Sequence, residues 1–194
     1  MKPGLISVIV LLVAAVMLAA PVHATNSDVG KEKRWAEQVI DSLLDGDELW
    51  LDDGGGHEFL GILTEGDASS GRAVILVHGI GVHPNWPDVI YPLREALLEN
   101  DITSLSIQMP ILPNEAEDAE YSKLYPEVPG RLQSAVDFLK DSGYAKIDIV
   151  AHSLGARMAT YYLSRESTDG VNSVVLIGMG NSSDGSWPES IDAL

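Results

Sequence analysis

A serine between small residues directly follows a predicted strand, at a position where its hydroxyl could act as a nucleophile. The segment Ala151-His152-Ser153-Leu154-Gly155 matches the pattern G-x-S-x-G, with alanine in place of the first glycine. In that pattern the serine lies on a sharp strand-to-helix turn with its oxygen exposed, and small neighbours let the chain pass closely. We therefore predict that Ser153 is a nucleophile. The alternative is an ordinary turn in which Ser153 caps the following helix.

A second segment could supply amides for the negative oxygen that forms when a serine attacks an acyl group. Residues His78-Gly79-Ile80-Gly81 come directly after the apolar run 73–77. A loop at this place donates one backbone N–H to such an oxygen, and the residue after the nucleophile donates the other. The predicted donors are Ile80 and Leu154. The supporting residues, which let the backbone approach closely or shape the loop, are His78, Gly79, Gly81 and Gly155. The alternative is a plain turn with His78 hydrogen-bonded in the core.

The elements that must position these segments alternate between strands and helices. Strands are predicted at 59–63, 73–77, 104–109, 146–150 and 173–177, and helices at 88–99, 131–140 and 154–165. This alternation predicts an α/β fold with a mostly parallel sheet and helices on both faces. The proline-containing segment 110–129 is predicted as a polar connection, with a lid over the site as the alternative.

The chain resembles the α/β-hydrolase superfamily in its pairing of Val77-His78-Gly79 with the serine motif. The longer string from His78 to Pro87 is similar to a bacterial domain-of-unknown-function family of exported α/β-hydrolase-like proteins. The resemblance covers roughly residues 59–180. It implies the fold and a hydrolytic ancestry, with a small-molecule acyl substrate, and it implies no particular ester.

The histidine that would complete a serine–acid–histidine triad does not follow Ser153 in this sequence, although the superfamily order places it there. The histidines are His23, His57, His78, His83 and His152. We expect a structural role for His152, with His83 as the less favoured substitute base. Asp184 follows the last predicted strand, where some hydrolases place the acid, but it has no histidine to orient. Because the apolar strand 173–177 lacks a later pairing partner, we expect a C-terminally truncated chain whose remaining strand–helix units carry the acid and the histidine.

The N-terminus has the features of a secretory signal peptide. Lys2 precedes an apolar run, and small residues lead to a predicted cleavage after Ala24. We therefore expect a signal peptide at 1–24, a leader with a short helix at 25–57, a hydrolase-like domain at 58–194, and a periplasmic or secreted protein without a stable membrane anchor. A retained anchor is the alternative, but the apolar run is shorter than the roughly 20 residues that a span needs.

Composition restricts the partners and the chemistry. Cleavage would leave 11 basic and 29 acidic residues, a net charge of −18, which disfavours nucleic acid as a partner. The sequence has no cysteine, and it shows no cluster with metal-ligand spacing and no phosphate-binding loop, so we expect no metal and no cofactor. The favoured function is a serine hydrolase of an ester or related acyl substrate, which would be nearly inactive without a base. The alternative is a non-catalytic envelope binding or accessory protein that keeps the fold. The oligomeric state is left open.

Overall fold

The computed structural model describes residues 25–165 and 169–180. The expected signal peptide, with His23, and the C-terminal segment that contains Asp184 lie outside the described residues. Six strands form one sheet in the order β1-β2-β4-β3-β5-β6. The strands are β1 (Asp47–Asp52), β2 (Glu58–Thr64), β3 (Arg72–Val77), β4 (Thr103–Ile107), β5 (Lys146–His152) and β6 (Val171–Ile177).

Strands β4, β3, β5 and β6 run parallel, while β1 and β2 form an antiparallel hairpin that joins the sheet beside β4. The register aligns Val77 of β3 with Ile107 of β4 and with Ala151 of β5. The carboxyl ends of these strands therefore meet at one edge of the sheet, which is where ligands bind in open α/β sheets. The predicted α/β fold with a mostly parallel sheet is confirmed.

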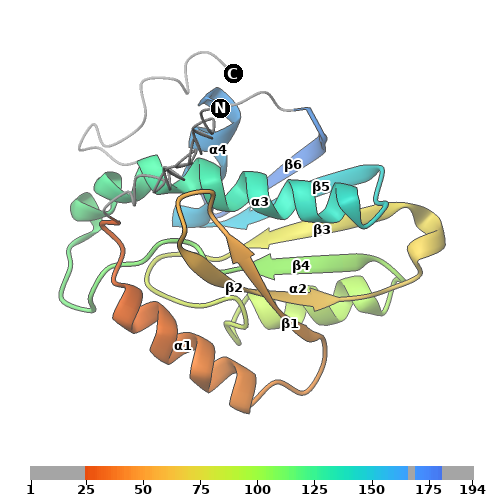
Figure 1. The fold of residues 1–194 in the computed structure, drawn as a ribbon, viewed down its shortest axis with the longest axis horizontal. Coiled ribbons are helices and arrows are strands. Elements are labelled where there is room, and N and C mark those ends of the chain that lie inside the picture. Colours follow the sequence, from red (N-terminus) through yellow and green to blue (C-terminus); the bar gives the residue numbers. More distant parts are fainter. Residues whose placement is uncertain (1–24, 166–168, 181–194) are drawn as a thin grey trace, which may run out of the picture.

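Helices cover both faces of the sheet (Figure 1). They are α1 (Val29–Asp41), α2 (Ile90–Leu98), α3 (Val128–Asp141) and α4 (Leu154–Arg165). Alternate residues of the buried strand β3 explain the layers: Ala73, Ile75 and Val77 belong to the core under α3 and α4, whereas Val74 and Leu76 pack with Ile90 of α2. On that second face, Ala36 and Val39 of α1 cover Leu60 and Ile62 of β2.

Three segments contain structure that the sequence pattern did not predict. The segment 25–57 includes strand β1, which pairs with β2 along its whole length, so this segment contributes a strand to the sheet. The connection after β4 contains the 3₁₀ helix η2 (Asp118–Glu127), and a shorter one, η1 (Ala68–Ser70), precedes β3. In η2, Tyr121, Leu124 and Tyr125 are buried in the main core. These side chains anchor the segment, which favours the plain connection over a lid.

Strand β6 lies at the edge of the described sheet. It pairs with β5 on one side, and no described strand pairs with it on the other. Its apolar residues Val175 and Leu176 are 50% and 39% exposed. The expected apolar edge strand is therefore present within the described residues. Among residues 25–165 and 169–180, no helix has both the length and the hydrophobicity of a transmembrane segment.

Candidate active site

Ser153 lies on a sharp turn between β5 and α4. Its φ of 53° is in the left-handed region, which non-glycine residues rarely adopt and which is found where structure imposes strain for a functional reason. Its N–H donates to Ile177 O at 2.8 Å, and its own carbonyl accepts from Ala156 N at 3.0 Å. A helix-capping residue usually has an extended backbone, so this geometry fits an elbow better than the plain cap.

The loop after β3 lies directly against this turn. A Cβ built on Gly79 would be 3.4 Å from Ser153 Cβ and 3.1 Å from His152 Nδ1. On the other side of the elbow, a Cβ on Gly155 would be only 2.3 Å from His78 O and 2.8 Å from Val77 O. Two glycines therefore let the two predicted segments approach more closely than side chains would allow. The fold brings together the serine turn and the loop at 78–81.

The amides of Ile80 and Leu154 are both available for a ligand. Neither N–H donates a hydrogen bond to an acceptor among the described residues. Leu154 is the first residue of α4, so its N–H is one of those that a helix leaves without an internal partner. Gly81 completes the loop with a φ of 67°. Such amides, held beside a nucleophile, can stabilise a developing oxyanion.

His78 is fully buried and is held by the backbone on both ring nitrogens. Its Nε2 accepts from Met109 N at 2.9 Å and lies 3.0 Å from Gln108 Nε2, while Nδ1 lies 2.8 Å from Gly79 O. Because Nε2 accepts, Nδ1 carries the proton and donates it to Gly79 O. Burial lowers the pKa of His78 to about 3, so the ring is neutral at ordinary pH. His78 therefore shapes the loop and does not face Ser153 as a base.

The other described histidines make no hydrogen bond to the serine hydroxyl. The His83 ring lies between Trp35 and Trp86, with centroids at 4.8 and 5.4 Å, and its Nδ1 accepts from Asn85 N. His57 Nε2 is 3.0 Å from Glu32 Oε2. His152 packs over Gly79. Among the described residues, no side chain hydrogen-bonds to Ser153 Oγ, and nothing in the contacts of His83 favours it as a base.

Mild acid should destabilise the protein through His78 and His83. Burial lowers their pKa values to about 3 and about 4, below the 6.5 of an unfolded chain. The unfolded state therefore binds protons first, so this stability is present above pH 6.5 and is lost as pH falls toward the folded values. At up to about 1.4 kcal/mol per pH unit for each ring, we expect the free energy of unfolding to drop by roughly 2–4 kcal/mol between pH 7 and 5.

Urea unfolding at the two pH values measures this drop. The variant His83→Asn should reduce it by up to about half, because an asparagine oxygen can still accept from Asn85 N–H but does not titrate. Equal stability of the unsubstituted protein at pH 7 and pH 5 would contradict the assignment of two neutral buried rings.

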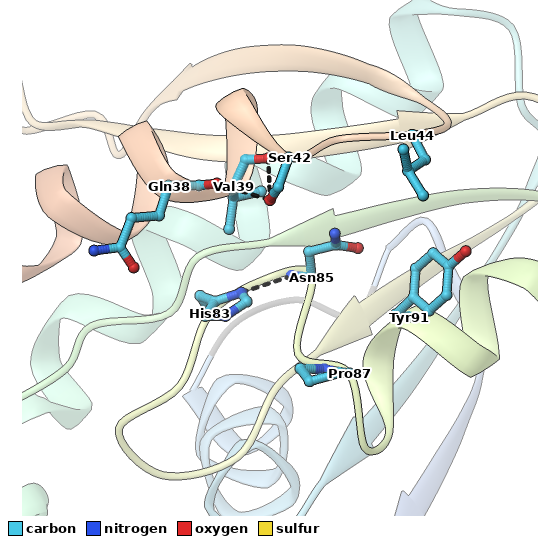
Figure 2. A pocket seen from close by; sticks show the side chains of 8 residues that line it. All are labelled: Gln38, Val39, Ser42, Leu44, His83, Asn85, Pro87 and Tyr91. Carbon is cyan, nitrogen blue, oxygen red and sulfur yellow. Dashed lines mark hydrogen bonds between the residues drawn. The ribbon is translucent and has the colours of Figure 1, made fainter.

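A cavity of about 370 Å³ lies between α1 and the connection from β3 to α2 (Figure 2). Gln38 and Val39 of α1 line one side together with Ser42, which caps that helix, and His83, Asn85 and Pro87 line the other side. Leu44 and Tyr91 complete the cavity. Ser153 is not among these residues. Residues 83–87, which end the string that resembles the domain-of-unknown-function family, form the wall of this cavity opposite α1. The cavity is not the predicted acyl site.

Structural comparison relates this fold to solved hydrolases. A dienelactone hydrolase-like promiscuous phosphotriesterase from metagenomic libraries matches with a TM-score of 0.55 at 15% identity, over 73% of this chain and 62% of that one. A dienelactone hydrolase from Anabaena variabilis matches with a TM-score of 0.53 at 21% identity, over 68% and 62%. An esterase from Exiguobacterium antarcticum matches with a TM-score of 0.53 at 15% identity, over 67% and 44%.

At such identities these matches establish the fold alone, which is that of the α/β hydrolases. The chain spans about two fifths to three fifths of the length of the three structures. It belongs to the family described as "Protein of unknown function (DUF3530)", whose model matches residues 3–129. That stretch includes the loop at 78–81 and ends before Ser153. No curated protein matches the sequence.

Within the described residues, no group of three or more histidine, aspartate or glutamate side chains is placed to hold a metal ion. Sequence reasoning also missed a set of buried polar residues behind the loop. Gln108 follows β4, Arg131 lies in the first turn of α3, and Glu32 lies in α1. The motif patterns contain none of them, because the residues contact one another only after the sheet and its covering helices have formed.

Proposed function

We propose that this protein is a serine hydrolase that cleaves a small ester or a related acyl compound. The observation that carries the proposal is the left-handed backbone of Ser153 beside the close approach of Gly79. Together they present a hydroxyl and two uncommitted amides at one edge of the sheet. The esterases and dienelactone hydrolases among the structural neighbours support an ester as the substrate class.

In this proposal, Ser153 Oγ attacks the acyl carbon and the carbonyl π electrons move to the oxygen. The N–H groups of Ile80 and Leu154 donate to that oxyanion, and the N-terminus of α4 adds a favourable partial positive charge. The hydroxyl proton must pass to a base as the new C–O bond forms. Because no described side chain hydrogen-bonds to Ser153 Oγ, we propose that the base lies outside the described residues.

Covalent labelling of the full-length protein tests this proposal. A fluorophosphonate probe should form one adduct, which peptide mass spectrometry should locate at Ser153. Ser153→Ala should abolish labelling, because Ser153 is the only serine with a left-handed backbone among residues 25–165 and 169–180. Ser122→Ala is the matched control, since Ser122 is exposed on η2 and should label like the unsubstituted protein.

Labelling that persists in Ser153→Ala, or no labelling of the full-length protein at all, would contradict a serine hydrolase. The second of these results would favour the alternative function, a non-catalytic envelope binding or accessory protein that uses the same fold.

A further inference from the structure

A buried ion pair lies behind the loop at 78–81. Arg131 of α3 and Glu32 of α1 face each other through two hydrogen bonds, Nη1 to Oε2 at 3.0 Å and Nη2 to Oε1 at 2.9 Å. Arg131 is fully buried, and Glu32 is 5% exposed. Burial alone would raise the pKa of Glu32, but the hydrogen bond to His57 and the charge and hydrogen bonds of Arg131 outweigh it and lower the pKa. The pair is therefore charged.

Arg131 also contacts the backbone that holds His78. Its Nη1 donates to Gln108 O at 2.9 Å, and the N–H of the same peptide unit, that of Met109, donates to His78 Nε2 at 2.9 Å. On the far side of the ring, Nδ1–H donates to Gly79 O at 2.8 Å, and the N–H of that peptide unit belongs to Ile80. Three hydrogen bonds and two peptide units thus connect a guanidinium to a predicted oxyanion donor.

The geometry of this connection fixes a direction. A peptide unit is planar and normally trans, so its C=O and N–H point in opposite directions, and the described chain has no cis peptide. Holding Gly79 O from one side therefore aims Ile80 N–H toward the other. The two peptide units and the His78 ring each accept a hydrogen bond on the side nearer Arg131 and offer an N–H donor on the other side. Consecutive bonds of this kind polarise one another, so the positive charge of Arg131 strengthens the donor at the end.

We propose that Arg131 is a positioning residue of the oxyanion hole, which acts through the Gln108–Met109 peptide, the His78 ring and the Gly79–Ile80 peptide to orient and polarise Ile80 N–H. This inference rests on the proposed function, because it assigns a purpose to the Ile80 amide. It gives one residue of α3, and through the ion pair one residue of α1, a part in the chemistry.

The test uses the double variant Glu32→Gln/Arg131→Gln, which removes both charges and leaves no buried charge without a partner. The matched control is Asp45→Asn/Arg94→Gln. Arg94 is also fully buried and is paired with Asp45 at 2.6 Å, but its side-chain hydrogen bonds among the described residues go to Thr64, Asn85 and Asp45, and not to the peptide units that hold His78. Both variants should lose comparable stability, so measurements are made well below their melting temperatures.

Two readouts are compared in the full-length protein. The first readout is NMR: the ¹⁵N and ¹H chemical shifts of the Ile80 amide and of the His78 ring nitrogens are measured. The second is fluorophosphonate labelling, separated into the maximal rate and the half-saturating probe concentration. Loss of one whole oxyanion donor costs about 10²–10³-fold in rate. For a weakened donor, we expect the maximal rate to fall about tenfold in the Glu32/Arg131 variant, with little change in half-saturation, and the Ile80 and His78 resonances to move. The control should change neither.

Unchanged Ile80 and His78 resonances in the Glu32/Arg131 variant would overturn the inference, whatever the labelling rate. Equal rate losses in both double variants would also overturn it, because they would trace the loss to stability. Shifted resonances in a protein whose Ser153 never labels would support the connection from Arg131 to Ile80 and would contradict the proposed function instead.

Discussion

Gly155→Ala is expected to destabilise the protein by about 3 kcal/mol and to slow labelling of Ser153. The added Cβ would lie 2.3 Å from His78 O and 2.8 Å from Val77 O, and both are backbone atoms that cannot turn away as a side chain can. Overpacking of this kind usually costs about 1–3 kcal/mol, and here relief requires the elbow and the loop at 78–81 to separate. Separation would move Ile80 N–H away from the serine.

Gly30→Ala is the matched control for this substitution. Gly30 is also the second residue of a helix, but a Cβ there would be at ordinary contact distance, 3.4 Å from its nearest neighbours. Alanine favours helix over glycine by up to about 1 kcal/mol, so this variant should be neutral or slightly more stable. Urea unfolding measures both variants. Equal stability of the two would contradict the close packing of α4 against the end of β3.

Arg131→Met should destabilise the protein by roughly 3–5 kcal/mol. The substitution leaves the Glu32 carboxylate buried without its guanidinium, and an uncompensated buried charge is the costly outcome of breaking such a pair. The cation–π contact of Arg131 with the Phe59 ring, 5.2 Å from guanidinium carbon to ring centroid, would be lost as well. Because neutralising the carboxylate removes the buried charge, Glu32→Gln in the same protein should recover a large part of the loss.

A double-mutant cycle by chemical denaturation measures this coupling between Glu32 and Arg131. We expect a coupling of more than about 1 kcal/mol, since the two side chains share two hydrogen bonds. Additive losses in the double variant would show that the two residues act independently and would remove the ion pair as the tie between α1 and α3.

The sequence was sufficient to predict the parts of the fold that depend on local pattern. Apolar runs such as 73–77 indicated buried strands, and the order of strand, small residues and helix around Ser153 indicated the turn that the structure shows. The prediction was incomplete for elements whose secondary structure depends on pairing with other parts of the chain. Strand β1 has acidic residues at both of its ends and only a short apolar centre, residues 49–51, and it forms a strand because β2 pairs with it. The burial of the two tyrosines of η2 could not be predicted, because their neighbours in the sequence are acidic residues that face solvent.

The same distinction applies to the candidate site. Ser153, Gly79 and Gly155 could be found from spacing, because close backbone approach leaves small residues in a recognisable order. Glu32, Gln108 and Arg131 could not be found in this way. Arg131 lies 99 positions after Glu32 in the sequence, and only the folded layers bring their side chains together. A buried charge pair leaves no local pattern in the sequence.

The structure of the full-length protein with a phosphonate bound at Ser153 would test the central claim most directly. We predict that the phosphonyl oxygen accepts hydrogen bonds from Ile80 N and Leu154 N, each at about 2.7–3.1 Å, with His78 Nδ1 still donating to Gly79 O. An adduct on another residue would contradict the account. So would a phosphonyl oxygen that points away from both amides.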